Sequence, residues 1–103
     1  MKKGILLHEV ADDVGVAVMD LRAGEQITVV TLEGQPVKQL TLVSDVPLGH
    51  KVAMRDLAPD QHVLEYGRPI GATSAGIAAG EHVHVHNLKS LRWAASSANL
   101  LEK

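Results

Sequence analysis

Apolar and polar residues alternate in short runs along this chain, with a turn signal roughly every eight to twelve residues. A period of two is typical of strands that bury one face, and no stretch shows the 3.6-residue period of an amphipathic helix of ordinary length. Glycine, proline and aspartate between the runs favour tight turns. The runs predicted as strands cover residues 4–8, 14–19, 26–32, 37–43, 50–57, 61–66, 68–71 and 82–86. The pattern predicts a small, mainly β fold of about seven or eight short strands, with at most short helical turns.

The clearest hairpin joins residues 26–32 to residues 37–43 around a loop that contains glycine. Residues 72–79 are rich in alanine and glycine, and Gly76 and Gly80 leave room for no more than one helical turn there. No internal repeat or low-complexity linker is evident. We expect one domain over residues 1–93, followed by a C-terminal tail at 94–103.

Composition narrows the class of protein. The 103 residues suit a single domain, and the core must be aliphatic because Tyr66 and Trp93 are the only aromatic residues. The net charge of −2, with both signs interspersed, gives no basic surface for nucleic acid. The chain contains no cysteine, no recognisable signal peptide and no apolar run of about 20 residues. We therefore expect a cytoplasmic protein that does not span a membrane.

Candidate chemistry is concentrated in residues 80–87, GEHVHVHN. On a strand, His82, His84 and His86 would line one face, while the two intervening valines would point to the other face. Imidazole is the commonest metal ligand in proteins and can act as an acid or base near neutral pH. The alternative is an exposed strand face on which the imidazoles are only solvated.

Four motifs, taken together, resemble the altronate/galactarate dehydratase family in the N-terminal SAF-type domain. In this sequence they read DDVGVA at 12–17, PLGHK at 47–51, YGRPIG at 66–71 and GEHVHVHN at 80–87. The first resembles the opening D-N-V-x-V-A of that domain, with Asp13 in place of asparagine. The resemblance covers nearly the whole chain as far as Trp93. It implies the β-clip fold, which also occurs in type III antifreeze proteins and in the C-terminal domain of sialic acid synthases.

The resemblance also implies a function as part of a larger enzyme. In altronate and galactarate dehydratases the SAF-type domain continues into a much larger catalytic region, which is absent from this sequence. A separate chain of this kind is similar to the alpha subunit of sulfolactate sulfo-lyase. We therefore expect a small subunit of a hydroxy-acid lyase, inactive alone, whose partner is a large catalytic subunit. The expected reaction is dehydration of a sugar acid, with sulfite elimination from sulfolactate as the other member of the class.

Elimination from a hydroxy acid sets requirements for the site. A proton beside a carboxylate must be removed, and a β-leaving group must depart. A divalent metal can stabilise the developing negative charge, and a general acid can protonate a leaving hydroxyl. The resemblance implies such a metal, often iron, bound mainly in the complete complex.

The candidate site residues follow from the motifs. We expect metal ligands at His82, His84 and His86. We expect catalytic roles for His50, His84 and His86, and substrate binding by Lys51, Asn87 and Tyr66. The Tyr66 ring is also compatible with a core position that leaves its hydroxyl in water.

Two functions from other classes stay open at this point. The domain could be a non-catalytic module that binds a sugar acid or another anion. It could equally be an oligomerisation domain with solvated histidines, which would self-associate when isolated.

Overall fold

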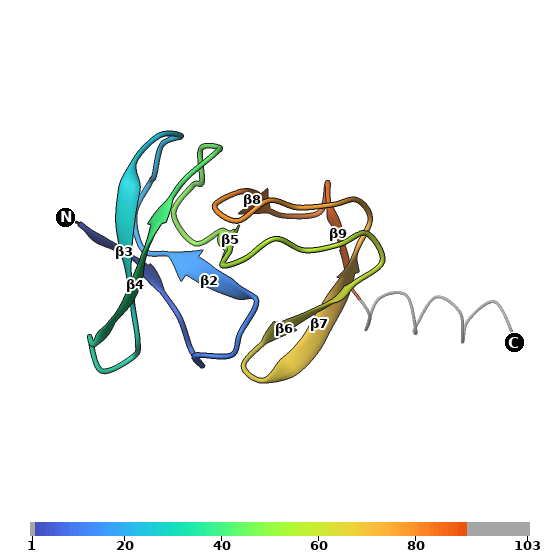
Figure 1. Cartoon of the computed structure of the whole chain (residues 1–103), viewed down its shortest axis with the longest axis horizontal. Coiled ribbons are helices and arrows are strands. Elements are labelled where there is room, and N and C mark those ends of the chain that lie inside the picture. Colours follow the sequence, from blue (N-terminus) through green and yellow to red (C-terminus); the bar gives the residue numbers. More distant parts are fainter. Residues whose placement is uncertain (1, 91–103) are drawn as a thin grey trace, which may run out of the picture.

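Nine short strands and the loops between them make up residues 2–90, the part of the chain that the computed structural model describes (Figure 1). In chain order the strands are β1 (Lys3–Leu6), β2 (Val14–Ala17), β3 (Gln26–Val30), β4 (Pro36–Thr41), β5 (Lys51–Ala53), β6 (His62–Glu65), β7 (Arg68–Thr73), β8 (His82–Val83) and β9 (Leu88–Ser90). Within residues 2–90 no helix forms, and so none that could cross a membrane. The mainly β prediction is confirmed, whereas the predicted tail at 94–103 lies outside the described residues.

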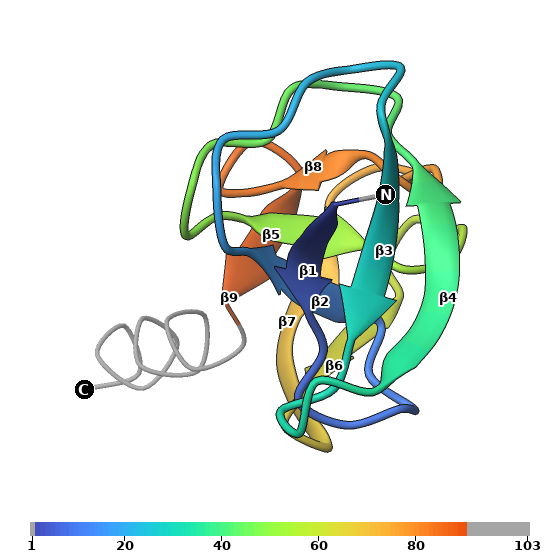
Figure 2. The same cartoon turned by 90° about the vertical axis from the view of Figure 1, so that its left-hand side faces the viewer.

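The strands form two sheets. The six-stranded sheet has the order β4-β3-β1-β2-β5-β8, and the three-stranded sheet has the order β6-β7-β9 (Figures 1 and 2). Strands β1 and β3 pair in parallel, and all other pairs in these sheets are antiparallel. The predicted hairpin is present as β3–β4. Strand β9 and the extension of β7 to Thr73 were not predicted, and residues 72–79 form no helical turn.

The aliphatic core consists of two clusters, and strands β2 and β5 lie between them. Ala17 and Val52 belong to the cluster under β1, β3 and β4, whereas Val14 and Ala53 belong to the cluster toward β6 and β8. Strand β2 therefore contributes side chains to both clusters and is covered on both faces. At Gly15 a Cβ atom would lie 2.7 Å from a methyl group of Ile5, so glycine allows β1 and β2 to approach closely.

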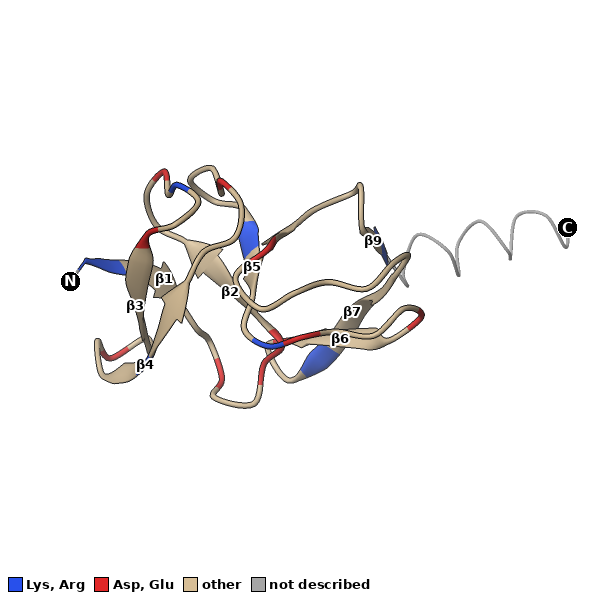
Figure 3. Cartoon of the chain, turned by 45° about the horizontal axis from the view of Figure 1, so that its top comes forward, with Lys and Arg blue, Asp and Glu red and all other residues tan. Residues whose placement is uncertain are grey.

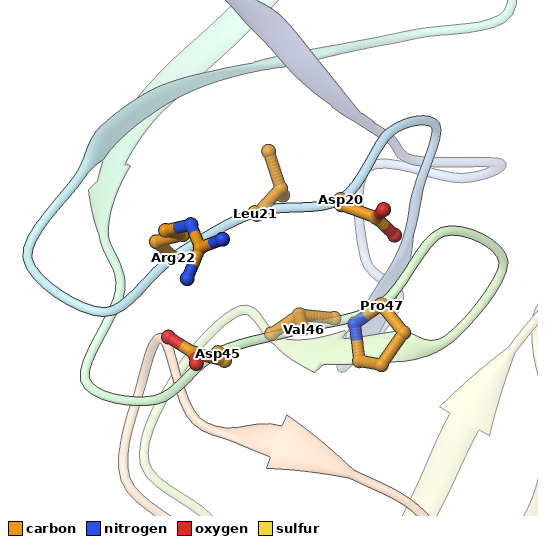
Figure 4. Close-up of a pocket in the computed structure, with 6 residues that line it drawn as sticks. All are labelled: Asp20, Leu21, Arg22, Asp45, Val46 and Pro47. Carbon is orange, nitrogen blue, oxygen red and sulfur yellow. The ribbon is translucent and has the colours of Figure 1, made fainter.

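Four loops of one geometry meet in two pairs, although no repeat is evident in the sequence. We call them the first loop pair and the second loop pair, and they comprise residues 18–25 with 43–50 and residues 54–61 with 74–81, respectively. An isolated bridge between Leu21 and Val46 joins the first pair (Figure 4). A bridge between Leu57 and Ile77 joins the second pair. All four bridging side chains are buried, so each pair anchors its loops to the core.

Each of the four loops ends in a turn whose last residue has a positive φ angle. These residues are Gly24, Gly49, Asp60 and Gly80, with φ between 58° and 88°. Three are glycines because the left-handed region penalises a Cβ atom. At Gly80 the space is also closed, since a Cβ atom there would collide with the backbone carbonyl of Thr41.

Two aspartates join the loops of the first pair, and each accepts a hydrogen bond from the backbone of the other loop. Asp20 accepts a hydrogen bond from the backbone N–H of Leu48 at 2.8 Å, and Asp45 accepts one from the N–H of Ala23 at 2.9 Å. Each aspartate directly precedes the bridging residue of its own loop. The same carboxylates line a hollow of about 200 Å³ between the two loops (Figure 4).

The second loop pair keeps only one of these two hydrogen bonds. Asp56 accepts from the N–H of Ala79 at 2.9 Å. The reciprocal position holds Gly76, which has no carboxylate, and the residue that would donate to it is Pro59, which has no N–H. In the second loop pair both the acceptor and the donor of this hydrogen bond are absent, so no polar group is left there without its partner.

Candidate histidine site

Three histidines converge where β5 and β8 form the edge of the six-stranded sheet. His82 begins β8, and His50 directly precedes β5. The two strands are antiparallel, with Lys51 opposite Val83. Continued by one residue, this register places His50 opposite His84. Residues that face each other across an antiparallel pair share one side of the sheet, so the two imidazoles lie on the same side.

The imidazoles of these three residues form one cluster, which we call the histidine cluster. Nδ1 of His50 lies 2.8 Å from Nε2 of His82, and the rings of His50 and His84 stack with centroids 4.4 Å apart. One ring nitrogen from each residue lies within 4.8 Å of the other two. His50 and His82 are half-buried and His84 is exposed, so the cluster is open to a ligand or a partner on one side.

A turn, rather than a longer strand, presents His84. Strand β8 ends at Val83, and residues 84–87 form a turn. The last of these residues, Asn87, is 4% exposed, and its side chain holds the turn together. Its Oδ1 accepts a hydrogen bond from the N–H of His84, and its Nδ2 donates one to the carbonyl of His82. The predicted strand through residue 86 is therefore wrong, and Val85 is 81% exposed instead of facing the core.

The turn changes which histidines can act together. Sequence alternation groups His82, His84 and His86, whereas the three ring nitrogens that converge belong to His50, His82 and His84. The ring of His86 stays close, with its centroid 5.3 Å from that of His82. Three imidazoles are a ligand set that suits divalent zinc, copper, iron or nickel, so the residues fit a metal of the expected kind.

The three residues predicted to bind substrate lie in different surroundings. Lys51 follows the cluster directly along β5 and pairs with Glu65, with Nζ 3.8 Å from the carboxylate. Asn87 uses its amide to hold the turn. Tyr66 is 58% exposed in the turn between β6 and β7, away from β8 (Figures 1 and 2). Its ring packs against that of His8 in a tilted arrangement, with a centroid distance of 3.9 Å. The structure thus brings Lys51 to the cluster but not Tyr66.

Sequence reasoning missed Glu65. Its side chain is 7% exposed and lies on the same side of β6 as the core residue Val63. The signal was present in the alternation, since a charged residue two positions from a core valine falls on the buried face of a strand. A buried charge without an evident partner in the sequence is a candidate for function.

Burial and neighbouring charges alter the protonation of the cluster. Burial disfavours the imidazolium form of His82 and lowers its pKa below the usual value for histidine. Repulsion from neighbouring imidazoles lowers this pKa further, in the order His50, His86 and His84. A neutral imidazole is the form that binds a metal, so the lowered pKa favours metal binding in mildly acidic solution.

The lowered pKa of His82 predicts a loss of stability in acid. Between the unfolded pKa, about 6.5, and the lower folded pKa, the unfolded chain binds more protons than the folded chain. The free energy of unfolding is therefore expected to decrease as the pH falls below about 6.5, measured by urea unfolding with a metal chelator present. The substitution His82→Gln is expected to flatten this dependence of stability on pH. The control substitution His62→Gln, at an exposed position of β6, is expected to leave it unchanged. An unchanged pH profile in His82→Gln would contradict the assignment.

Charged residues of both signs are interspersed over the described part of the chain, as composition predicts (Figure 3). The fold and the histidine cluster together define a small β domain that presents imidazoles at an open sheet edge. A site of this kind needs further groups from a ligand or a second protein to be enclosed.

Comparison with known proteins identifies the family. The family model of the altronate/galactarate dehydratase SAF domain matches residues 2–91. The chain is 39% identical over 94 residues to the (2R)-sulfolactate sulfo-lyase subunit alpha of Chromohalobacter salexigens, covering 90% of this chain and 100% of that subunit. It is 46% identical over 79 residues to the altronate dehydratase of Escherichia coli, and 33% identical over 90 residues to that of Bacillus subtilis. These two matches cover 77% and 87% of this chain but only 15% and 17% of the dehydratases.

The chain belongs to the altronate/galactarate dehydratase SAF-domain family. The match spans the full length of a lyase subunit but only a small part of each larger dehydratase. The chain is therefore the counterpart of the small subunit of a lyase, as the motifs predicted.

Proposed function

We propose that this chain supplies the histidine cluster to the active site of a hydroxy-acid lyase, and that a large catalytic chain completes the site. The observation that carries the proposal is the convergence of His50, His82 and His84 at an open edge. Imidazoles held together but left accessible on one side suit a site that a second chain encloses. The relatives support this arrangement, because the chain matches a separate subunit of one lyase and a small part of a larger dehydratase.

We assign the metal ligands to His50, His82 and His84, so that His50 takes the place that alternation gave to His86. When bound, a divalent metal such as iron would stabilise the negative charge that develops beside the substrate carboxylate. His86 is then free to protonate the leaving group, since its ring lies beside His82 but outside the ligand set. Lys51 holds the substrate carboxylate, and Asn87 positions His84 through the turn.

The substrate is a hydroxy acid, and dehydration is the reaction we propose. The names of the relatives include altronate and sulfolactate, which both carry a carboxylate and a hydroxyl group on neighbouring carbons. The cysteine-free composition supports a location in the cytoplasm.

Reconstitution from separate chains tests the proposal. The tagged chain is purified from its native cells, and bound proteins are identified by mass spectrometry. We expect a larger chain that is homologous to the part of altronate dehydratase beyond the matched region. The recombinant pair should convert D-altronate or (2R)-sulfolactate, and neither chain should do so alone. Full turnover by the large chain alone would contradict a shared site.

A further inference from the structure

A hollow beside the histidine cluster carries an inference about the substrate. Its volume is about 280 Å³, which is enough for a small organic acid. Its lining combines two charged side chains, one imidazole and three aliphatic side chains, namely Lys51, Glu65, His84, Ile70, Val85 and Leu88. His84 lines the hollow and also belongs to the histidine cluster, so the hollow adjoins the proposed metal site.

The Glu65 carboxylate is incompletely satisfied by the protein. Among the described residues its polar partner is Lys51 at 3.8 Å, which is beyond hydrogen-bond distance. The residue is 5% exposed, and a buried carboxylate normally accepts several hydrogen bonds. A ligand hydroxyl group in the hollow would donate a hydrogen bond to this carboxylate in place of water.

The two charges in the hollow have different exposure. The Lys51 side chain is 36% exposed, so its ammonium can meet a carboxylate that enters from solvent. The Glu65 side chain is 7% exposed and lies deeper, where water screens its charge less. A second anionic group at that depth would be repelled, whereas a hydroxyl group would be bound.

We propose that this hollow binds a hydroxy acid with a single anionic group, and that Glu65 determines this specificity. Lys51 pairs with the carboxylate, Glu65 accepts a hydrogen bond from a hydroxyl group, and the aliphatic side chains cover the carbon skeleton. The inference deepens the proposed function and rests on it for the site. It selects a polyhydroxy monocarboxylate such as an aldonate over a doubly charged acid such as sulfolactate.

Titration of the full-length chain with the two probes tests this inference without a catalytic step. Binding of D-altronate and of (2R)-sulfolactate is followed in ¹H–¹⁵N spectra through the amides of Lys51, Glu65 and His84. We expect altronate to bind at least about tenfold more tightly than sulfolactate. Glu65→Gln removes the charge at constant shape and should bring the ratio of dissociation constants close to one. The matched control Glu33→Gln, in an exposed turn, should keep the wild-type ratio.

A second variant covers the case in which Glu65→Gln does not fold. Glu65→Asp keeps the charge but withdraws the carboxylate, so altronate should bind several-fold more weakly while sulfolactate stays excluded. A merely structural Lys51–Glu65 pair would change stability and leave the ratio as it is. Equal binding of the two probes, binding of neither, or a ratio unaffected by these substitutions would overturn the inference. Turnover by the reconstituted pair is a separate readout, so failure of the proposed function would be seen independently.

Discussion

Asp12→Ala is expected to lower the free energy of unfolding by at least about 4 kcal/mol, the largest stability effect we predict for a single substitution. The Asp12 carboxylate is fully buried and accepts three backbone hydrogen bonds. The donors are the N–H groups of Glu9 at 3.2 Å, Tyr66 at 2.9 Å and Gly67 at 2.9 Å. It thereby ties the loop after β1 to the turn between β6 and β7.

The magnitude follows from the charge of the acceptor. A hydrogen bond to a charged group contributes about 1.5–3 kcal/mol, and a buried N–H left without a partner costs about 1–3 kcal/mol. The alanine variant no longer buries a charge, which offsets part of the loss. The expected total therefore lies near the lower end of the summed contributions of the three hydrogen bonds. Domains of this size are stable by about 5–15 kcal/mol, so the variant would be partly or largely unfolded.

Urea unfolding of Asp12→Ala and of Asp45→Ala provides the comparison. Asp45 is an exposed aspartate with a single backbone hydrogen bond, to the N–H of Ala23, and its loss should cost about 1 kcal/mol. If both variants lose the same small amount of stability, the three-bond carboxylate does not have the role assigned to it.

His84→Ala is expected to lower kcat/KM of the reconstituted lyase by about a thousandfold or more. The substitution removes a proposed metal ligand that also lines the hollow. A site with two imidazoles in place of three binds a metal more weakly, and the loss of transition-state stabilisation by several kcal/mol corresponds to such a factor. The folded domain should survive, because the His84 side chain is exposed and its backbone contacts to Asn87 do not depend on it.

The measurement combines kinetics with metal content. We expect His84→Ala to contain less metal after dialysis, and the circular dichroism spectrum of the chain to be unchanged. His62→Ala, at an exposed histidine of β6, is the matched control and should keep both activity and metal. Turnover of His84→Ala within threefold of the wild type would exclude the proposed role.

The strands were predictable where pairing partners are close in the sequence. The β3–β4 hairpin follows from alternation and a short loop, and its residues Ile27, Val29 and Leu40 are buried. Strand β8 was predicted too long, because the side chain of Asn87 stabilises a turn that competes with strand propensity. Local alternation holds no information about that competition.

The site was predictable in its residue types but not in its grouping. Alternation and the motif pointed to the correct stretch, yet His50 joins the cluster through strand pairing across 32 residues of sequence. The same limit applies to Asp12, which the sequence indicates first as a turn residue. Its hydrogen bonds to Tyr66 and Gly67 span 54 and 55 residues. Contacts of this length depend on the topology of the whole fold.

The two loop pairs bear on the origin of the domain. Two copies of a short strand–loop–strand chain that associated about a twofold axis would form reciprocal contacts like those of Asp20 and Asp45. Two successive duplications of such a chain, each followed by fusion, would give four equivalent loops in one protein. After fusion each copy evolves separately, and the joint absence of a carboxylate at Gly76 and of an N–H at Pro59 is the kind of paired change that divergence leaves behind.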